Sequence, residues 1–151
     1  MEPAWLRAAY IELRHGVREV PGAEANARII EYHRSTSLKA TSDEVAWCAA
    51  FVGWALHKAG TVATGSAAAR SYIGWGVGVS LRHPPIGAMV VLARGEGPQP
   101  GPEVRDAQGH VGFFWSHGGP GELVVLGGNQ GDRVSLATYP VHRLLGVRWA
   151  A

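Results

Sequence analysis

Residues 45–60 read VAWCAAFVGWALHKAG, and no other stretch of the chain is as informative about its architecture. Its apolar residues form two adjacent lines at four-residue spacing, Trp47, Phe51, Ala55 and Ala59 on one and Cys48, Val52 and Leu56 on the other. Apolar side chains at this spacing lie along one side of an α-helix. Gly60 suits the end of that helix. We therefore expect a buried helix that carries the only cysteine of the chain.

The start of this helix determines what Cys48 can do. Thr41-Ser42-Asp43-Glu44 has the form of a capping box, which places Cys48 in the second turn, whereas a start near Val45 places it in the first. We favour the later start, because the positive end of a helix lowers the pKa of a thiol and only the thiolate attacks a carbonyl. The helix alone favours another interpretation, in which Cys48 is a small core residue, since free cysteines are among the most buried side chains.

The rest of the chain divides into a helical first half and a β-rich second half. Besides the helix at 45–60, helices are expected at 3–15, from about Ala23 to His33 and from 66 to about 75. Short β-like runs follow Pro84-Pro85, at 88–93, 110–116, 123–126, 134–139 and 144–149. Helices followed by a mostly antiparallel sheet of about five strands predict an α+β fold, with residues 1–151 forming one domain.

Composition and charge narrow the classes of partner. The formal net charge is +2, from 14 Lys and Arg against 12 Asp and Glu, and no basic run is present, so we expect no nucleic-acid partner. No stretch approaches the eighteen apolar residues of a membrane span, and the N-terminus lacks the pattern of a signal peptide. We expect synthesis in the cytoplasm, no membrane insertion and, by default, a monomer. A single cysteine excludes an internal disulfide and a multi-cysteine metal cluster.

Among the seven histidines, His110 is the best candidate for a catalytic base, because it opens the apolar strand HVGFFWS directly after a glycine. A second strand, ELVVLGGNQ, leads to Asn129, and HGGPG between the two strands predicts a turn. A hairpin centred between Gly119 and Pro120 places His110 opposite Asn129, where an amide oxygen can orient an imidazole. A one-residue bulge would separate them onto opposite faces, and the alternative is that 127–129 only form a turn.

Five motifs follow one another along the chain: DEVAWCAAFVGWALHKAG (43–60), ARSYIGWG (69–76), GHVGFF (109–114), VLGGNQGDRVSLATYP (125–140) and LLGVRWA (144–150). In this order they resemble the CHAP and NlpC-like cysteine peptidases and amidases, among them peptidoglycan hydrolases of the phage-lysin and secreted-effector type. The resemblance covers the chain from about Glu19 to Trp149. It implies a papain-like fold.

The resemblance also implies a role for each matched residue. In that superfamily a cysteine at the start of a helix is the nucleophile, a histidine opening a strand is the base, and a polar residue on the next strand orients the histidine. The matching residues here are Cys48, His110 and Asn129. Many CHAP domains have a glutamate two residues before that asparagine, whereas this chain has Gly127. The orienting role therefore rests on Asn129, with Gln130 as the second choice.

The implied activity is hydrolysis of an amide bond of bacterial peptidoglycan, by an endopeptidase or an N-acetylmuramoyl-L-alanine amidase, through an acyl-enzyme and with no cofactor or metal. The backbone N–H of Cys48 is expected to hold the oxyanion, and Asp43 or Trp47 to shape that pocket. The expected partners are peptidoglycan and, for a toxin, an immunity or inhibitor protein. Such an enzyme would reach the cell wall or periplasm through a holin or a secretion system.

Two alternatives remain open. A zinc-dependent wall amidase would use His110 and His117 with Asp106 or Glu122, although their spacing matches no standard zinc motif. The other is a non-catalytic cell-wall-binding module on the same fold, in which Cys48 is structural.

Overall fold

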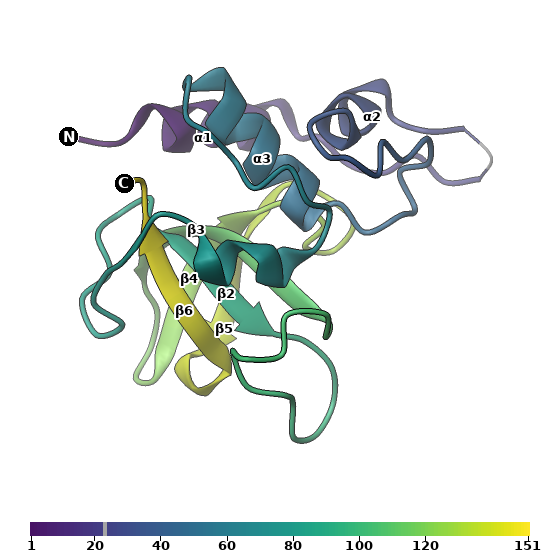
Figure 1. Ribbon diagram of the computed structural model, residues 1–151. Coiled ribbons are helices and arrows are strands. Elements are labelled where there is room, and N and C mark those ends of the chain that lie inside the picture. Colours follow the sequence, from purple (N-terminus) through teal and green to yellow (C-terminus); the bar gives the residue numbers. More distant parts are fainter. Residues whose placement is uncertain (23) are drawn as a thin grey trace.

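Three α-helices pack against one end of an antiparallel sheet in the computed structural model, which describes residues 1–22 and 24–151 (Figure 1). The helices are α1 (Ala4–His15), α2 (Ala27–His33) and α3 (Cys48–Lys58). The six strands are β1 (Val77–Gly78), β2 (Met89–Ala93), β3 (Gly109–His117), β4 (Glu122–Gly127), β5 (Ser135–Pro140) and β6 (Leu144–Trp149). The predicted α+β architecture is confirmed. Within the described ranges, no helix has both the length and the apolar character needed to cross a bilayer.

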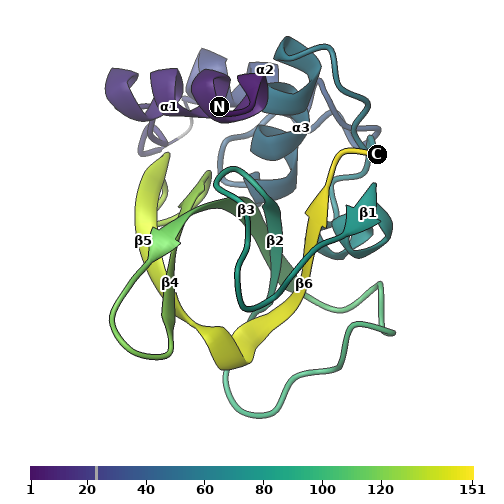
Figure 2. The same cartoon turned by 90° about the vertical axis from the view of Figure 1, so that its left-hand side faces the viewer.

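The strand order across the sheet is β1-β6-β2-β3-β4-β5. The sheet is strongly curved, so that β5 and β6 bend toward each other (Figure 2). Because of this curl, β2 is buried on both sides. Met89 and Val91 pack into the main core with the helices, whereas Val90 and Leu92 join a second apolar cluster that also contains Phe114, Val125 and Val147. The two clusters fix β2 and β3 in the middle of the sheet.

Helix α3 is the centre of the main core. All of its residues from Cys48 to Leu56 are buried, and it packs on α1, α2 and β3. The predicted buried helix is confirmed, and its apolar surface extends beyond the one side that the four-residue spacing defines. This packing brings the first turn of α3 close to the start of β3.

Helix α3 begins at Cys48, later than both predicted starts, and Trp47 is its N-cap residue. The alternative capping box at Thr41–Glu44 does not form, and the Asp43 carboxylate instead accepts hydrogen bonds from the backbone N–H groups of Val20 and Asn26, at 2.9 and 2.8 Å. The backbone N–H of Glu44 donates to Ser42 Oγ at 3.2 Å, which makes a local turn instead. Cys48 is therefore the first helical residue.

Other elements differ from the prediction only in detail. Helix α2 begins at Ala27, where Asn26 accepts from the backbone N–H of Arg28; its predicted start at Ala23 lies outside the described residues. The helix expected at 66–75 is a 3-10 helix, η1 (Ala69–Gly74), and another, η2 (Val141–Arg143), precedes β6. The sixth strand, β1, pairs with the end of β6. The glycine- and proline-rich segment between β2 and β3 is irregular, as expected.

Candidate active site

Cys48 combines burial with the position at which a helix is most electropositive. The unpaired N–H groups of a first helical turn stabilise a negative charge. Phe51 donates its backbone N–H to the Trp47 carbonyl at 2.9 Å, which closes this first turn. The Cys48 side chain is 4% exposed, so the thiol lies just beneath the surface.

His110 is the second residue of β3 and interacts with the Cys48 thiol. Burial acts to raise the pKa of Cys48, but hydrogen bonding with His110 and the charge of its ring act to lower it, as do the backbone groups of Val111 and Ala49. The net result is a thiol pKa below its ordinary value. An apolar core without such partners would raise that pKa. The His110 ring therefore favours the thiolate form of Cys48.

Gln130 holds the other side of the imidazole. Its Oε1 lies 2.9 Å from His110 Nε2, and its Nε2 donates to the backbone carbonyls of Ser135 and Val125 at 2.8 and 3.2 Å. These two carbonyls fix which end of the amide faces His110, because carbonyl oxygens accept only from the amide nitrogen. Since Gln130 Oε1 is an acceptor, His110 Nε2 carries a proton and donates it. Nδ1 is then the ring nitrogen that remains to exchange a proton with the thiol.

The structure brings Gln130, rather than Asn129, to His110. Phe113 pairs with Leu126, which is the register of the predicted hairpin, although a β-bulge shifts the pairing nearer the turn. Strand β4 ends at Gly127, however, and Asn129 has a left-handed backbone with φ of 57°. The chain therefore leaves the strand path before Asn129 can face the histidine. The side chain of the next residue, Gln130, reaches back to it.

Gly127 makes room for this contact. A Cβ added there would lie 2.6 Å from Gln130 Oε1 and 3.4 Å from His110 Nε2. A side chain at this position would occupy the place where Gln130 meets His110. The absence of a side chain at Gly127 and the use of Gln130 are thus linked.

We expect Gly127→Ala to impair the reactivity of Cys48 more than the stability of the fold. The added methyl displaces Gln130 Oε1 from His110, and a ring that is no longer held toward the thiol stabilises the thiolate less, so we expect the alkylation rate to fall by roughly three- to tenfold. The measurement is the rate of Cys48 alkylation at neutral pH, with thermal unfolding as the check on folding. Gly131→Ala in the following turn is the control: its Cβ would meet no atom within 4 Å, although its φ of +66° adds local strain. Equal alkylation rates in the two variants would contradict the assigned role of Gly127.

Asp43 and Trp47 stabilise the start of α3 through contacts with other parts of the chain. The Asp43 carboxylate is 1% exposed and is bound to the backbone at Val20 and Asn26. Trp47 is fully buried and donates its indole N–H to Glu19 at 2.9 Å. Its ring packs on Gly128, where an added Cβ would lie 2.6 Å away. For the oxyanion this leaves the Cys48 backbone N–H, which has no hydrogen-bond acceptor among the described residues.

The residues of the zinc alternative do not converge. His110 and His117 stand near opposite ends of β3, and seven residues of strand span roughly 23 Å. One metal ion cannot bind both side chains. In the part of the chain that the structure describes, no three His, Cys, Asp or Glu side chains are grouped closely enough to hold a metal ion.

The sequence analysis missed two residues that support the site, Arg70 and Tyr139. Arg70 is fully buried in η1, and its guanidinium donates to four backbone carbonyls of the segment before β3, those of Gln108, Gly101, Val104 and Pro100, at 2.7–3.0 Å. Tyr139 donates its hydroxyl to Gln130 Oε1 at 3.1 Å. The alternation of side chains along a strand at 135–140 could have placed Ser135 and Tyr139 on one face of β5. No sequence pattern predicts the hydrogen-bond partners of Arg70.

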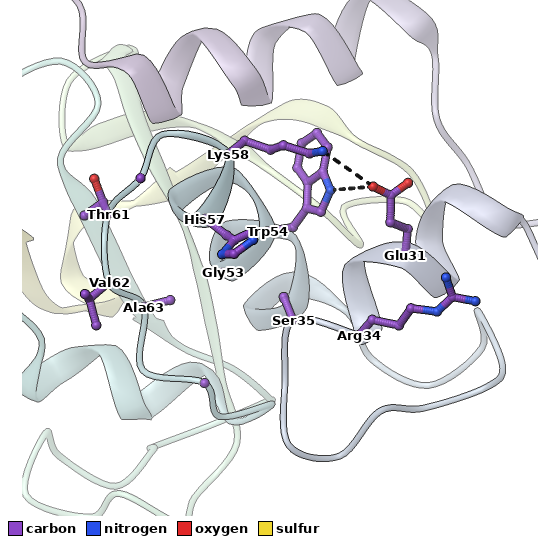
Figure 3. A pocket seen from close by; sticks show the side chains of 12 residues that line it. Glu31, Arg34, Ser35, Gly53, Trp54, His57, Lys58, Thr61, Val62 and Ala63 are labelled. Atoms are coloured by element: carbon purple, nitrogen blue, oxygen red, sulfur yellow. Dashed lines mark hydrogen bonds and ion pairs between the residues drawn. The ribbon is translucent and has the colours of Figure 1, made fainter.

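A pocket of about 750 Å³ lies on another side of α3 (Figure 3). It is lined by Glu31, Arg34 and Ser35, by the α3 residues from Gly53 to Lys58 that face it, and by residues of the segment 60–65. Trp54 and Lys58 both reach Glu31 at its edge. None of its lining residues is Cys48, His110 or Gln130. Cys48 and His110 are buried, at 4% and 5% exposure.

Comparison with protein-family models finds no match to this chain, and a search of curated proteins finds no similar sequence.

Proposed function

We propose that this protein is a cysteine hydrolase that cleaves an amide bond of bacterial peptidoglycan. Cys48 is the nucleophile, His110 the general acid and base, and Gln130 the residue that orients His110. One observation carries the proposal: the thiol at the first position of α3 lies beside His110, whose Nε2 is 2.9 Å from Gln130 Oε1, and this histidine acts to lower the pKa of Cys48 although burial acts to raise it. A cysteine that serves only as core packing has no need of a histidine held by a fully hydrogen-bonded amide, and burial alone would raise its pKa.

The reaction follows from which atoms face one another. The Cys48 thiolate adds to the amide carbonyl, and the oxyanion that forms accepts the Cys48 backbone N–H. His110 Nδ1–H protonates the leaving nitrogen, the C–N bond breaks, and a thioester remains on Cys48. Water then gives a proton to Nδ1 and adds to the thioester, and the C–S bond breaks. The products are a carboxylic acid and the restored thiolate–imidazolium pair.

The substrate class is supported by the resemblance of the five motifs to wall hydrolases. The bond is either that between the lactyl group and L-alanine or one within the stem peptide. A net charge of +2 and a sequence pI of about 9.0 also favour weak attraction to anionic wall polymers. This attraction concentrates the enzyme at the wall without selecting a bond.

Purified sacculi test the proposal. We expect the protein to expose new amino groups in them, each paired with a new carboxylate, which is on the lactyl group if the lactyl–alanine amide is cut, and mass spectrometry of the fragments identifies the bond. Iodoacetamide should abolish the release, and a chelator should leave it unchanged. Sacculi that bind the protein but yield no new fragments would support a wall-binding module instead and would contradict this proposal.

A further inference from the structure

Gln130 Oε1 is shared by two donors from different strands. His110 approaches it from β3 at 2.9 Å, and the Tyr139 hydroxyl approaches it from β5 at 3.1 Å. Because Gln130 Oε1 only accepts hydrogen bonds, the Tyr139 hydroxyl must be the donor. The oxygen that holds the histidine is therefore itself held from a second direction.

Residues of strand β5 form hydrogen bonds with both ends of the Gln130 side-chain amide. Near one end of β5 the Ser135 carbonyl accepts from Gln130 Nε2 at 2.8 Å, and near the other end Tyr139 donates to Oε1. β5 pairs with β4 along its whole length, with Tyr139 opposite Leu123 and Ser135 opposite Gly127. A rotation of the amide would break both contacts. The position of the acceptor oxygen is thus set by a rigid element.

Tyr139 also touches the imidazole and remains a donor in the physiological range. Its ring lies 5.4 Å from that of His110, between centroids, with an interplanar angle of 32°. Burial, and next the nearby Cys48 charge, raise the pKa of Tyr139 to about 12. The hydroxyl therefore keeps its proton wherever the Cys48 thiolate forms.

We propose that Tyr139 is a positioning residue, whose hydroxyl fixes Gln130 Oε1 at the point from which it orients His110 toward Cys48. The inference rests on the proposed function, because it takes Cys48 and His110 to be the reactive pair. It adds a fourth residue, on β5, that acts on the thiol only through Gln130 and His110.

A double-mutant cycle tests the proposal without any substrate. Tyr139→Phe, Gln130→Met and the double variant are alkylated with iodoacetamide over a range of pH, and Cys48 is the only cysteine that can react. We expect Tyr139→Phe to raise the apparent pKa of Cys48 by about half a unit, which is roughly a threefold loss of thiolate below that pKa. Gln130→Met should raise it further, and the double variant should equal Gln130→Met alone, because Tyr139 acts through Gln130.

Tyr10→Phe is the matched control, since Tyr10 is an exposed residue of α1 that stacks on Trp115, and its loss of a hydroxyl should leave the alkylation profile unchanged. Thermal unfolding confirms that each variant folds; if Gln130→Met does not, Gln130→Leu takes its place. A Tyr139→Phe profile identical to that of the wild type, or additive shifts in the double variant, would overturn the inference. A coupled profile in a protein that releases no wall fragments would uphold this inference and overturn the proposed function.

Discussion

A Cys48→Ala protein is expected to release wall fragments at the background rate, a loss of at least about 10⁴-fold, because no other group can form the acyl-enzyme. The substitution removes one sulfur atom from a site that is 4% exposed, so folding and binding to sacculi should survive. Activity is measured as fragment release from purified sacculi, and binding by co-sedimentation. His110→Ala should show a loss of similar size, since the two residues act as a unit.

His117→Ala is the matched control for this experiment, because His117 is an exposed histidine at the far end of the same strand. It should retain wild-type activity. Wild-type activity in Cys48→Ala would remove the thiol from the mechanism. Inactivity of a well-folded His117→Ala would revive the zinc alternative.

The largest expected loss of stability comes from Arg70→Met. The guanidinium is fully buried, and its four hydrogen bonds to carbonyls fix the segment from Pro100 to Gln108. Methionine fills much of the same volume but donates nothing, which leaves those carbonyls without their partner. Because hydrogen bonds to a charged group are individually worth about 1.5–3 kcal/mol and are not additive, we expect a loss of about 3 kcal/mol or more. For a chain of this size that lowers the Tm by roughly 6–12 °C.

Arg82→Met provides the comparison, since Arg82 is an exposed arginine in a turn. Its unfolding free energy should stay within about 0.5 kcal/mol of the wild type. Hydrogen exchange should show faster exchange in Arg70→Met within the segment before β3. Equal stabilities of the two variants would show that the buried guanidinium contributes nothing to the fold.

Local patterns in the sequence were enough to predict the architecture. The four-residue spacing in α3 and the short apolar runs after Pro84-Pro85 are properties of neighbouring residues, and both lead to the observed elements. Cys48 and His110 could be proposed as site residues from local patterns too, because each lies at the start of a helix or strand that the sequence predicts. The two residues come together in the structure because α3 packs on β3.

What the sequence could not predict depends on contacts between distant residues. Asp43 reads as part of a helix cap, but its carboxylate is bound to the backbone at Val20 and Asn26. The choice between Asn129 and Gln130 depends on the left-handed backbone at Asn129 and on the space left by Gly127. Neither feature is visible in a pattern of residue types. The roles of Arg70 and Tyr139 are likewise set by partners far along the chain.

The most direct test of the central claim is the pH dependence of Cys48 alkylation in the wild type and in His110→Ala. The claim is that His110 keeps Cys48 ionised where an ordinary thiol, with a pKa of about 8.5, is protonated. Thiolate forms as the pH rises through the thiol pKa, so a lowered pKa moves the rise in alkylation rate to lower pH.

We predict that the wild-type rate reaches its plateau below the ordinary thiol range, and that His110→Ala moves the rise upward by a unit or more, on the order of a tenfold loss of thiolate at neutral pH. A wild-type rate that rises only at or above the ordinary range, with the same profile in His110→Ala, would contradict the account.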